Sequence, residues 1–320
     1  MIIGGHSHSL LLKDGARDLN EEDVEEGVEQ VIVSGPYPTE VTNLDGKTTH
    51  IVQAYRYGQY AGLVRLEYDQ DENLTSLNGD PILLNRDIPL HRETALLIDG
   101  WRESFKWALE KSYGTLKKDL PLSLCRYEEC ALGNLVSDAI QWFFKADIAL
   151  TNSGGLRAGL SAGNVTLGDA MGVLPFPNNL VMFPISGQEL QQIVENIVAA
   201  RRPDGKKVIS IGHWSGLKYL YDSVRPEFQR IVSASVFDGA LKRYEAIQKD
   251  RLYNLVTTDF VANGGDNLLV KSRESYQYSF GPVIVDAFLG YIEHKQIVDP
   301  GIEGRIVVIK HQKKDKRKRV

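Results

Sequence analysis

The sequence predicts a mixed α/β (α+β) fold of two parts joined by a helix, and three observations predict it. The first hundred residues are rich in strand-like segments, an amphipathic helical pattern follows, and helical and strand-like segments then alternate. At 320 residues the chain is long enough for one large or two ordinary domains. An apolar fraction of 42% and a charged fraction of 25% are typical of globular proteins, so a packed core is expected.

The first hundred residues predict β-structure. Strand-like runs at residues 1–5, 50–57 and 61–69 are joined by turn-forming stretches such as NLDGK and DQDENL. The helical pattern that follows covers residues 99–116. Its apolar positions Trp101, Phe105, Ala108, Leu109 and Ser112 fall at helical spacing with charges between them, which indicates an amphipathic linker helix.

Beyond this helix the elements alternate. Residues 131–145 carry apolar side chains at helical spacing, and short strands are predicted at 146–152 and 179–185. Ser186 and Glu189 form a capping-box pattern, which predicts a helix that starts at Ser186. Residues 253–270 predict a strand, a glycine turn and a returning segment.

Two histidines separated by one residue, His6 and His8, follow a short apolar run and two glycines. Imidazole is a common ligand of zinc, manganese and similar ions, and the glycines let the backbone approach closely. An H-x-H pattern alone is a weak indication of a metal site, and two ordinary loop histidines are the alternative.

Three later stretches carry polar or aromatic residues in turns. TNSGGLR puts Asn152 and Arg157 around two glycines, a pattern that suits phosphate or carboxylate binding or, alternatively, a plain tight turn. LPFPNN presents Phe176 between two prolines, and DFVANGGDN carries Phe260 and Asp266. Two aromatic side chains on separate loops can clamp a flat base, although each alone is better explained as a core residue.

The two cysteines, Cys125 and Cys130, are five residues apart. This spacing permits either a small disulfide loop or two free thiols, and the residues alone leave both open. The net charge of −5 gives no indication of a nucleic-acid partner, and we interpret the basic C-terminal run KHQKKDKRKRV as a solvated tail. The sequence contains no apolar stretch long enough to span a bilayer.

Four of these stretches occur together in an order that resembles the 5′-nucleotidase family, most closely its ecto-5′-nucleotidase and apyrase branch. They are CRYEECALGNLVSDA, TNSGGLR, GVLPFPN and FVANGGDN. The resemblance extends from IIGGHSHSLLL to GIEGRIVV. It implies the C-terminal strands of a metallophosphoesterase sandwich at 1–95, a linker helix at 96–119, a 5′-nucleotidase C-terminal substrate-binding domain at 120–310 and a basic tail at 311–320.

The resemblance also implies roles for individual residues. Phe176 and Phe260 would sandwich the base, Asp266 would hold the ribose hydroxyls, and Arg126, Asn152 and Arg157 would contact the substrate. His6 and His8 would ligate two divalent ions, zinc first and manganese as an alternative, and Cys125 would pair with Cys130 in a disulfide. The earlier metal-binding elements of the family are expected upstream of GGHSH, so the resemblance implies an N-terminally truncated catalytic domain with an incomplete metal site.

The function expected from the resemblance is metal-dependent hydrolysis of nucleoside 5′-phosphates such as AMP, with little activity of this chain alone. Alternatives are an inactive nucleotide-binding module and a related hydrolase: an apyrase, a UDP-sugar hydrolase or a cyclic-nucleotide phosphodiesterase. The resemblance further implies an extracellular, cell-surface or periplasmic location, and it allows a homodimer.

Overall fold

The computed structural model describes residues 1–320 except 6, 8, 14–32, 270–276 and 310–320. The chain divides into two compact units, Met1–Trp101 (the first unit) and Arg102–Val320 (the second unit). Mixed α-helices and β-sheets confirm the predicted fold class.

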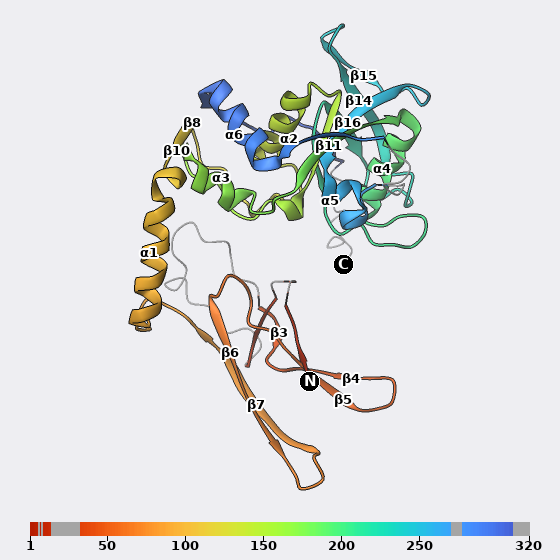
Figure 1. The fold of residues 1–320 in the computed structure, drawn as a ribbon. Coiled ribbons are helices and arrows are strands. Elements are labelled where there is room, and N and C mark those ends of the chain that lie inside the picture. Colours follow the sequence, from red (N-terminus) through yellow and green to blue (C-terminus); the bar gives the residue numbers. More distant parts are fainter. Residues whose placement is uncertain (6, 8, 14–32, 270–276, 310–320) are drawn as a thin grey trace, which may run out of the picture. The chain divides into compact units, whose positions relative to one another are not determined.

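The described part of the first unit consists mainly of β-strands (Figure 1). In chain order they are β1 (Ile2–Ile3), β2 (Leu10–Leu12), β3 (Val33–Pro36), β4 (Thr39–Thr42), β5 (Thr48–Val52), β6 (Tyr60–Tyr68) and β7 (Leu74–Leu83). They form a three-stranded sheet in the order β1-β5-β4 and two pairs, β2-β3 and β6-β7. A small apolar cluster of Leu11, Tyr37 and Val52, with Val64 packed on it, forms the core of the described part of this unit.

Helix α1 (Arg92–Leu109) contains the predicted linker pattern, but the predicted end of that helix was wrong. The helix stops at Leu109, and Ser112 belongs to strand β8 (Ser112–Leu116). This strand pairs with β10 (Gly163–Thr166) and β18 (Ile297–Val298), so long-range sheet pairing replaces the helical continuation that local spacing indicated. None of the residues of α1 is buried, and Trp101 is 60% exposed.

The second unit contains most of the regular structure. Its helices are α2 (Ala131–Phe144), α3 (Leu167–Val173), α4 (Gly187–Ala199), α5 (Asp259–Ala262) and α6 (Ile284–Lys295). Its remaining strands are β9 (Ile148–Asn152), β11 (Asn179–Ser186), β12 (Gly212–Ser215), β13 (Leu217–Tyr221), β14 (Ile231–Asp238), β15 (Arg243–Ala246), β16 (Leu252–Thr258), β17 (Ser279–Val283) and β19 (Ile306–Val308). Two 3₁₀ turns are η2 (Ser153–Gly155) and η3 (Gly265–Asn267).

A five-stranded mixed sheet in the order β12-β9-β16-β11-β17 forms the centre of this unit. Ala149, Val256 and Leu180 on one face pack into a cluster with α2 and α6. Alternate residues on the other face, such as Leu150 and Phe183, pack with α4. Figure 1 shows α2 and α6 on one side of β11 and β16 and α4 on the other, so the sheet is covered by helices on both faces.

Local sequence signals explain where several of these helices begin. Cys130 caps α2 by accepting a hydrogen bond from the amide of Gly133, and Ser186 caps α4 by accepting one from the amide of Glu189. The strand and glycine turn predicted within residues 253–270 are present as β16 and η3, but the short helix α5 between them was not predicted. Thr258 caps α5, and Leu268 and Leu269 are buried after the glycine turn.

Candidate functional site

The loops that carry the candidate residues leave one end of the central sheet. Strand β16 ends at Thr258, which lies opposite Leu180 near the start of β11. Strand β9 runs parallel to β16, with Ala149 opposite Val256, and it ends at Asn152. The loops after β9, before β11 and after β16 therefore start at the same sheet end, although they are far apart in the sequence.

Asn152 and Asp266 meet across two of these loops. The side-chain amide Nδ2 of Asn152 donates a hydrogen bond of 2.7 Å to Oδ2 of Asp266. Asp266 has a φ of 55°, in the left-handed region, and its carbonyl accepts a hydrogen bond from the amide of Ile209. The strained backbone and both hydrogen bonds fix the direction of this carboxylate.

Arg157 and Phe176 also lie together. The guanidinium of Arg157 stands 5.6 Å from the centroid of the Phe176 ring, within the range of a cation–π contact, and Nη1 donates to the carbonyl of Gly154. Phe176 remains 44% exposed. A shallow pocket beside it is lined by Thr151, Asn152, Gly155, Leu174, Phe176, Asn178, Thr258 and Ile284.

Phe260 is the second aromatic side chain at this sheet end. It lies in α5, two residues after the end of β16, and is 43% exposed. Its ring rests against the backbone of Gly265, where any Cβ atom would collide with it. An exposed phenylalanine held against a glycine is available for contact with a ligand.

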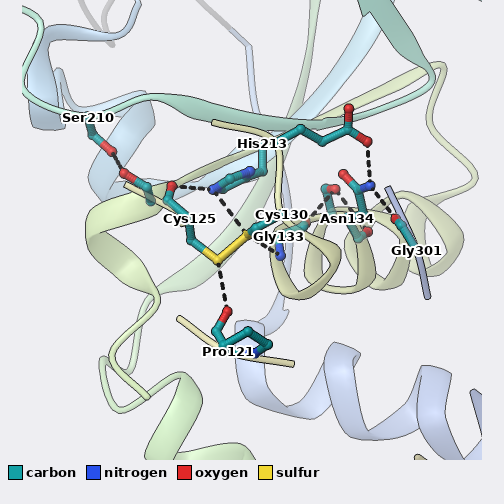
Figure 2. The surroundings of a disulfide bond; sticks show 11 residues. Pro121, Cys125, Cys130, Gly133, Asn134, Ser210, His213 and Gly301 are labelled. Atoms are coloured by element: carbon teal, nitrogen blue, oxygen red, sulfur yellow. Dashed lines mark hydrogen bonds between the residues drawn. A yellow bond between two sulfur atoms is a disulfide. The ribbon is translucent and has the colours of Figure 1, made fainter. Parts of the chain in front are cut away.

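A disulfide between Cys125 and Cys130 (Figure 2) closes a short loop. Arg126 is the first residue of this loop after Cys125. Both cysteines are buried, and Arg126 is partly exposed. Among the described residues, its side chain has no hydrogen-bond or ion-pair partner. The partly exposed guanidinium of Arg126 is therefore attached to a loop whose two ends are buried and cross-linked.

His213 and Ser210 contact the segments that carry the candidate residues, and the sequence predicted neither of them. His213 lies in β12 opposite Thr151, and its Nε2 is 2.9 Å from the carbonyl oxygen of Cys125. Ser210 contacts Ser153 through their hydroxyls at 2.7 Å and accepts a hydrogen bond from the amide of Gly154. The stretch SIGHW carries both residues, and its histidine and tryptophan within a small-residue run were the only local signal.

Burial controls the protonation of His213. The side chain is fully buried, which disfavours the imidazolium and lowers its pKa from 6.5 to about 4. The Cys125 carbonyl and the charge of Glu129 favour the charged form and oppose this shift in part, whereas Arg305 adds to it. The ring is therefore neutral at physiological pH.

The proposed metal ligands His6 and His8 lie outside the described residues. Within the described part of the chain, one cluster of three groups has metal-ligating side chains, namely Cys125, Cys130 and His213. Its two sulfur atoms are joined in the disulfide, so they are not thiolates. This cluster does not fit a metal ion.

Comparison with known proteins identifies the family. The family described as "5′-nucleotidase, C-terminal domain" matches residues 112–272, half of the chain. The chain belongs to the 5′-nucleotidase family. It is similar to an apyrase of Tabanus yao, with 29% identity over 96% of this chain and 56% of that protein. It is also similar to the 5′-nucleotidase of Homo sapiens, with 27% identity over 96% of this chain and 54% of that protein.

A solved structure agrees with this assignment. The crystal structure of a 5′-nucleotidase precursor from Thermus thermophilus matches 97% of this chain and 59% of that chain, with a TM-score of 0.76 and 29% identity. This member of the 5′-nucleotidase family spans about half the length of the curated relatives it matches. Among its described helices, none is long and apolar enough to cross a membrane.

Proposed function

We propose that the second unit binds a nucleoside 5′-phosphate, and that this binding serves hydrolysis of the phosphate ester to nucleoside and phosphate. One observation carries the proposal. Asn152, Phe176, Phe260 and Asp266 lie in strand ends and connecting segments at one end of the central sheet, and the Asn152–Asp266 hydrogen bond joins the end of β9 to the segment after β16. In the proposal, the phenylalanines contact the base, Asp266 contacts the ribose, and nearby arginines contact the phosphate.

In this proposal the base stacks between Phe176 and Phe260. Both rings are partly exposed and held by neighbours, Phe176 by Arg157 and Phe260 by the backbone at Gly265. Stacking of one base on an aromatic side chain contributes about 1–3 kcal/mol. A clamp of this kind tolerates different bases, so it accounts for nucleoside binding without selecting one base.

Asp266 holds the ribose. Asn152 occupies its Oδ2, whereas Oδ1 has no hydrogen-bond partner among the described residues. An ionised carboxylate with a free oxygen accepts hydrogen bonds from two adjacent hydroxyls. Asn152 acts as a positioning residue, since it fixes the rotamer of Asp266.

Arg126 and Arg157 bind the phosphate. Guanidinium groups match phosphate oxygens in charge and geometry, and Arg126 is without an ionic partner among the described residues. The ions expected from the family resemblance would be held by His6 and His8 together with further ligands, and residues 1–95 would belong to the metallophosphoesterase part. Bound divalent ions would polarise the phosphoryl group and activate the attacking water.

The disulfide supports a location outside the cytosol. Cys125 and Cys130 are cross-linked and buried, and such structural disulfides persist in oxidising compartments. We therefore propose an extracellular, cell-surface or periplasmic location.

A second candidate is hydrolysis of nucleoside di- and triphosphates, as the name of the Tabanus yao apyrase indicates for that protein. The groups proposed to hold the base and ribose serve either substrate, since they do not contact the phosphate chain. Titration of the chain with AMP, ADP and ATP separates the candidates. Tighter binding of AMP favours hydrolysis of nucleoside monophosphates. Tighter binding of ADP or ATP favours hydrolysis of di- and triphosphates.

The proposal is tested by calorimetric titration of the 320-residue chain with adenosine and with 2′-deoxyadenosine. We expect adenosine to bind about tenfold more tightly, because one hydroxyl bonded to a carboxylate is worth roughly 1.5 kcal/mol or more. Asp266→Asn should remove this preference, and Asp250→Asn, at an exposed position, should retain it. Equal affinities of the wild-type chain for the two nucleosides contradict the ribose assignment.

A further inference from the structure

We propose that His213 is a positioning residue that holds Arg126 in place for the phosphate group of the ligand. The inference rests on the proposed function and extends it to a residue that contacts neither base, ribose nor phosphate. It starts from the location of His213, which joins the disulfide loop to the sheet end where Asn152 lies.

The contact of His213 with the loop is a directed hydrogen bond. A carbonyl oxygen only accepts, so Nε2 of His213 carries the proton and donates it to the carbonyl of Cys125. That carbonyl belongs to the peptide bond that links Cys125 to Arg126. The imidazole therefore fixes the peptide plane directly before the arginine.

The ring of His213 is buried and closely packed. His213 is 0% exposed, and its atoms lie where a Cβ on Gly133 would be, so the ring packs directly on the first turn of α2. Figure 2 shows the imidazole beside the disulfide, with its Nε2 toward Cys125. Because His213 belongs to β12, its hydrogen bond ties the Cys125–Cys130 loop to that strand.

The other end of the loop is fixed independently. Buried Glu129 accepts hydrogen bonds from the side chain of Asn134 at 2.8 Å and from the amides of Glu303, Arg305 and Ile306 at 2.8, 2.7 and 3.2 Å. The disulfide then ties Cys130, the next residue, to Cys125. Within the loop, the amides of Cys125 and Tyr127 bond to the carbonyls of Leu122 and Leu124. The carbonyl of the Cys125–Arg126 peptide bonds to His213, so we assign the orientation of that carbonyl to the imidazole.

The segment that bears His213 also contacts the other site loops. The amide of Ile209 bonds to Asp266, and Ser210 bonds to the Ser153–Gly154 turn. One short segment thus connects the ribose side, through Asp266, with the phosphate side, through Arg126. The ribose-side contacts come from Ile209 and Ser210, whereas the His213 hydrogen bond reaches only the disulfide loop. Loss of that hydrogen bond should therefore affect phosphate recognition selectively.

The experiment compares the affinities of AMP and adenosine for variants of the full chain by calorimetric titration. Arg126→Ala serves as the reference. It should weaken the binding of AMP by about tenfold or more and change the affinity for adenosine by less than about twofold. His213→Leu, which removes the donor at similar volume, should produce the same selective loss. His213→Gln, whose amide can donate to the Cys125 carbonyl, should retain most of the AMP affinity.

Each outcome decides the inference. If Arg126→Ala weakens AMP selectively and His213→Leu does not, the positioning role of His213 is overturned while the proposed phosphate contact stands. If Arg126→Ala leaves the AMP-to-adenosine ratio unchanged, both are overturned. An equal loss of AMP and adenosine in His213→Leu indicates a purely structural role and also overturns the inference. Should the leucine variant fail to fold by circular dichroism, His213→Asn, whose shorter amide does not reach Cys125, takes its place with the same expected loss.

Discussion

The two units of the chain enclose very different amounts of apolar side chain. In the described part of the first unit, the core cluster consists of Leu11, Tyr37 and Val52 with Val64 beside them. The second unit has two large clusters, one on each face of its central sheet. Since burial of apolar surface is the main stabilising contribution to folding, the second unit should be far the more stable of the two.

The location of the candidate residues follows the same division. Asn152, Arg157, Phe176, Phe260 and Asp266 all lie in the second unit, on loops supported by the doubly covered sheet. Binding residues on loops need a rigid scaffold to hold their geometry. The proposed nucleoside-binding residues therefore lie in the unit with the larger apolar core.

The largest expected effect is a difference in hydrogen exchange between the units. Amides in the strands of the first unit, such as β6, should exchange faster than those of β11 and β16 by on the order of a hundredfold, because few buried contacts oppose local opening there. Exchange followed by mass spectrometry of peptic fragments measures this difference. Equal protection of the β6 and β16 amides from exchange would contradict the expected difference in stability between the units.

A second effect arises from the pH dependence of stability in the second unit. His213 has a pKa of about 4 when buried and about 6.5 when unfolded, so below pH 6.5 the unfolded chain binds a proton that the folded chain does not. Stability should therefore fall as the pH drops from 6.5 to 4, by as much as about 3 kcal/mol.

Urea unfolding of the second unit at several pH values checks this expectation, with His213→Gln as the control. The variant lacks the titrating imidazole, so its stability should fall less over the same range. The expectation fails if the wild-type chain and the variant lose stability in parallel between pH 6.5 and pH 4.

A smaller effect is expected from Gly265→Ala. A methyl group at this position collides with the ring of Phe260 and forces it away. Loss of one stacked ring should weaken adenosine binding by about tenfold. Gly172→Ala is the matched control, since no atom lies within 4 Å of a Cβ there. Similar adenosine affinities of the two variants would argue against a role of Phe260.

Much of the second unit was predictable because its signals are local. The helical spacing of Leu132, Leu135 and Val136 correctly predicted a buried face of α2, and the turn after β9 followed from its glycines. The family resemblance rested on ordered motifs, and the match of residues 112–272 confirmed it.

What the sequence missed depends on contacts between distant segments. The helical pattern extended to Ser112, but pairing of β8 with β18, more than 180 residues away, determines the structure there. Likewise, His213 acts on Cys125 across 88 residues, and Ser210 acts on Ser153 across 57. Spacing within one segment carries no information about such partners, so neither residue was predicted.

The most direct measurement is the affinity of adenosine for the 320-residue chain in which both Phe176 and Phe260 are replaced by alanine. The account predicts a loss of at least about a hundredfold, because two stacking contacts disappear while the sheet beneath them stays folded. An affinity equal to that of the wild-type chain, in a variant whose circular dichroism is unchanged, would contradict it.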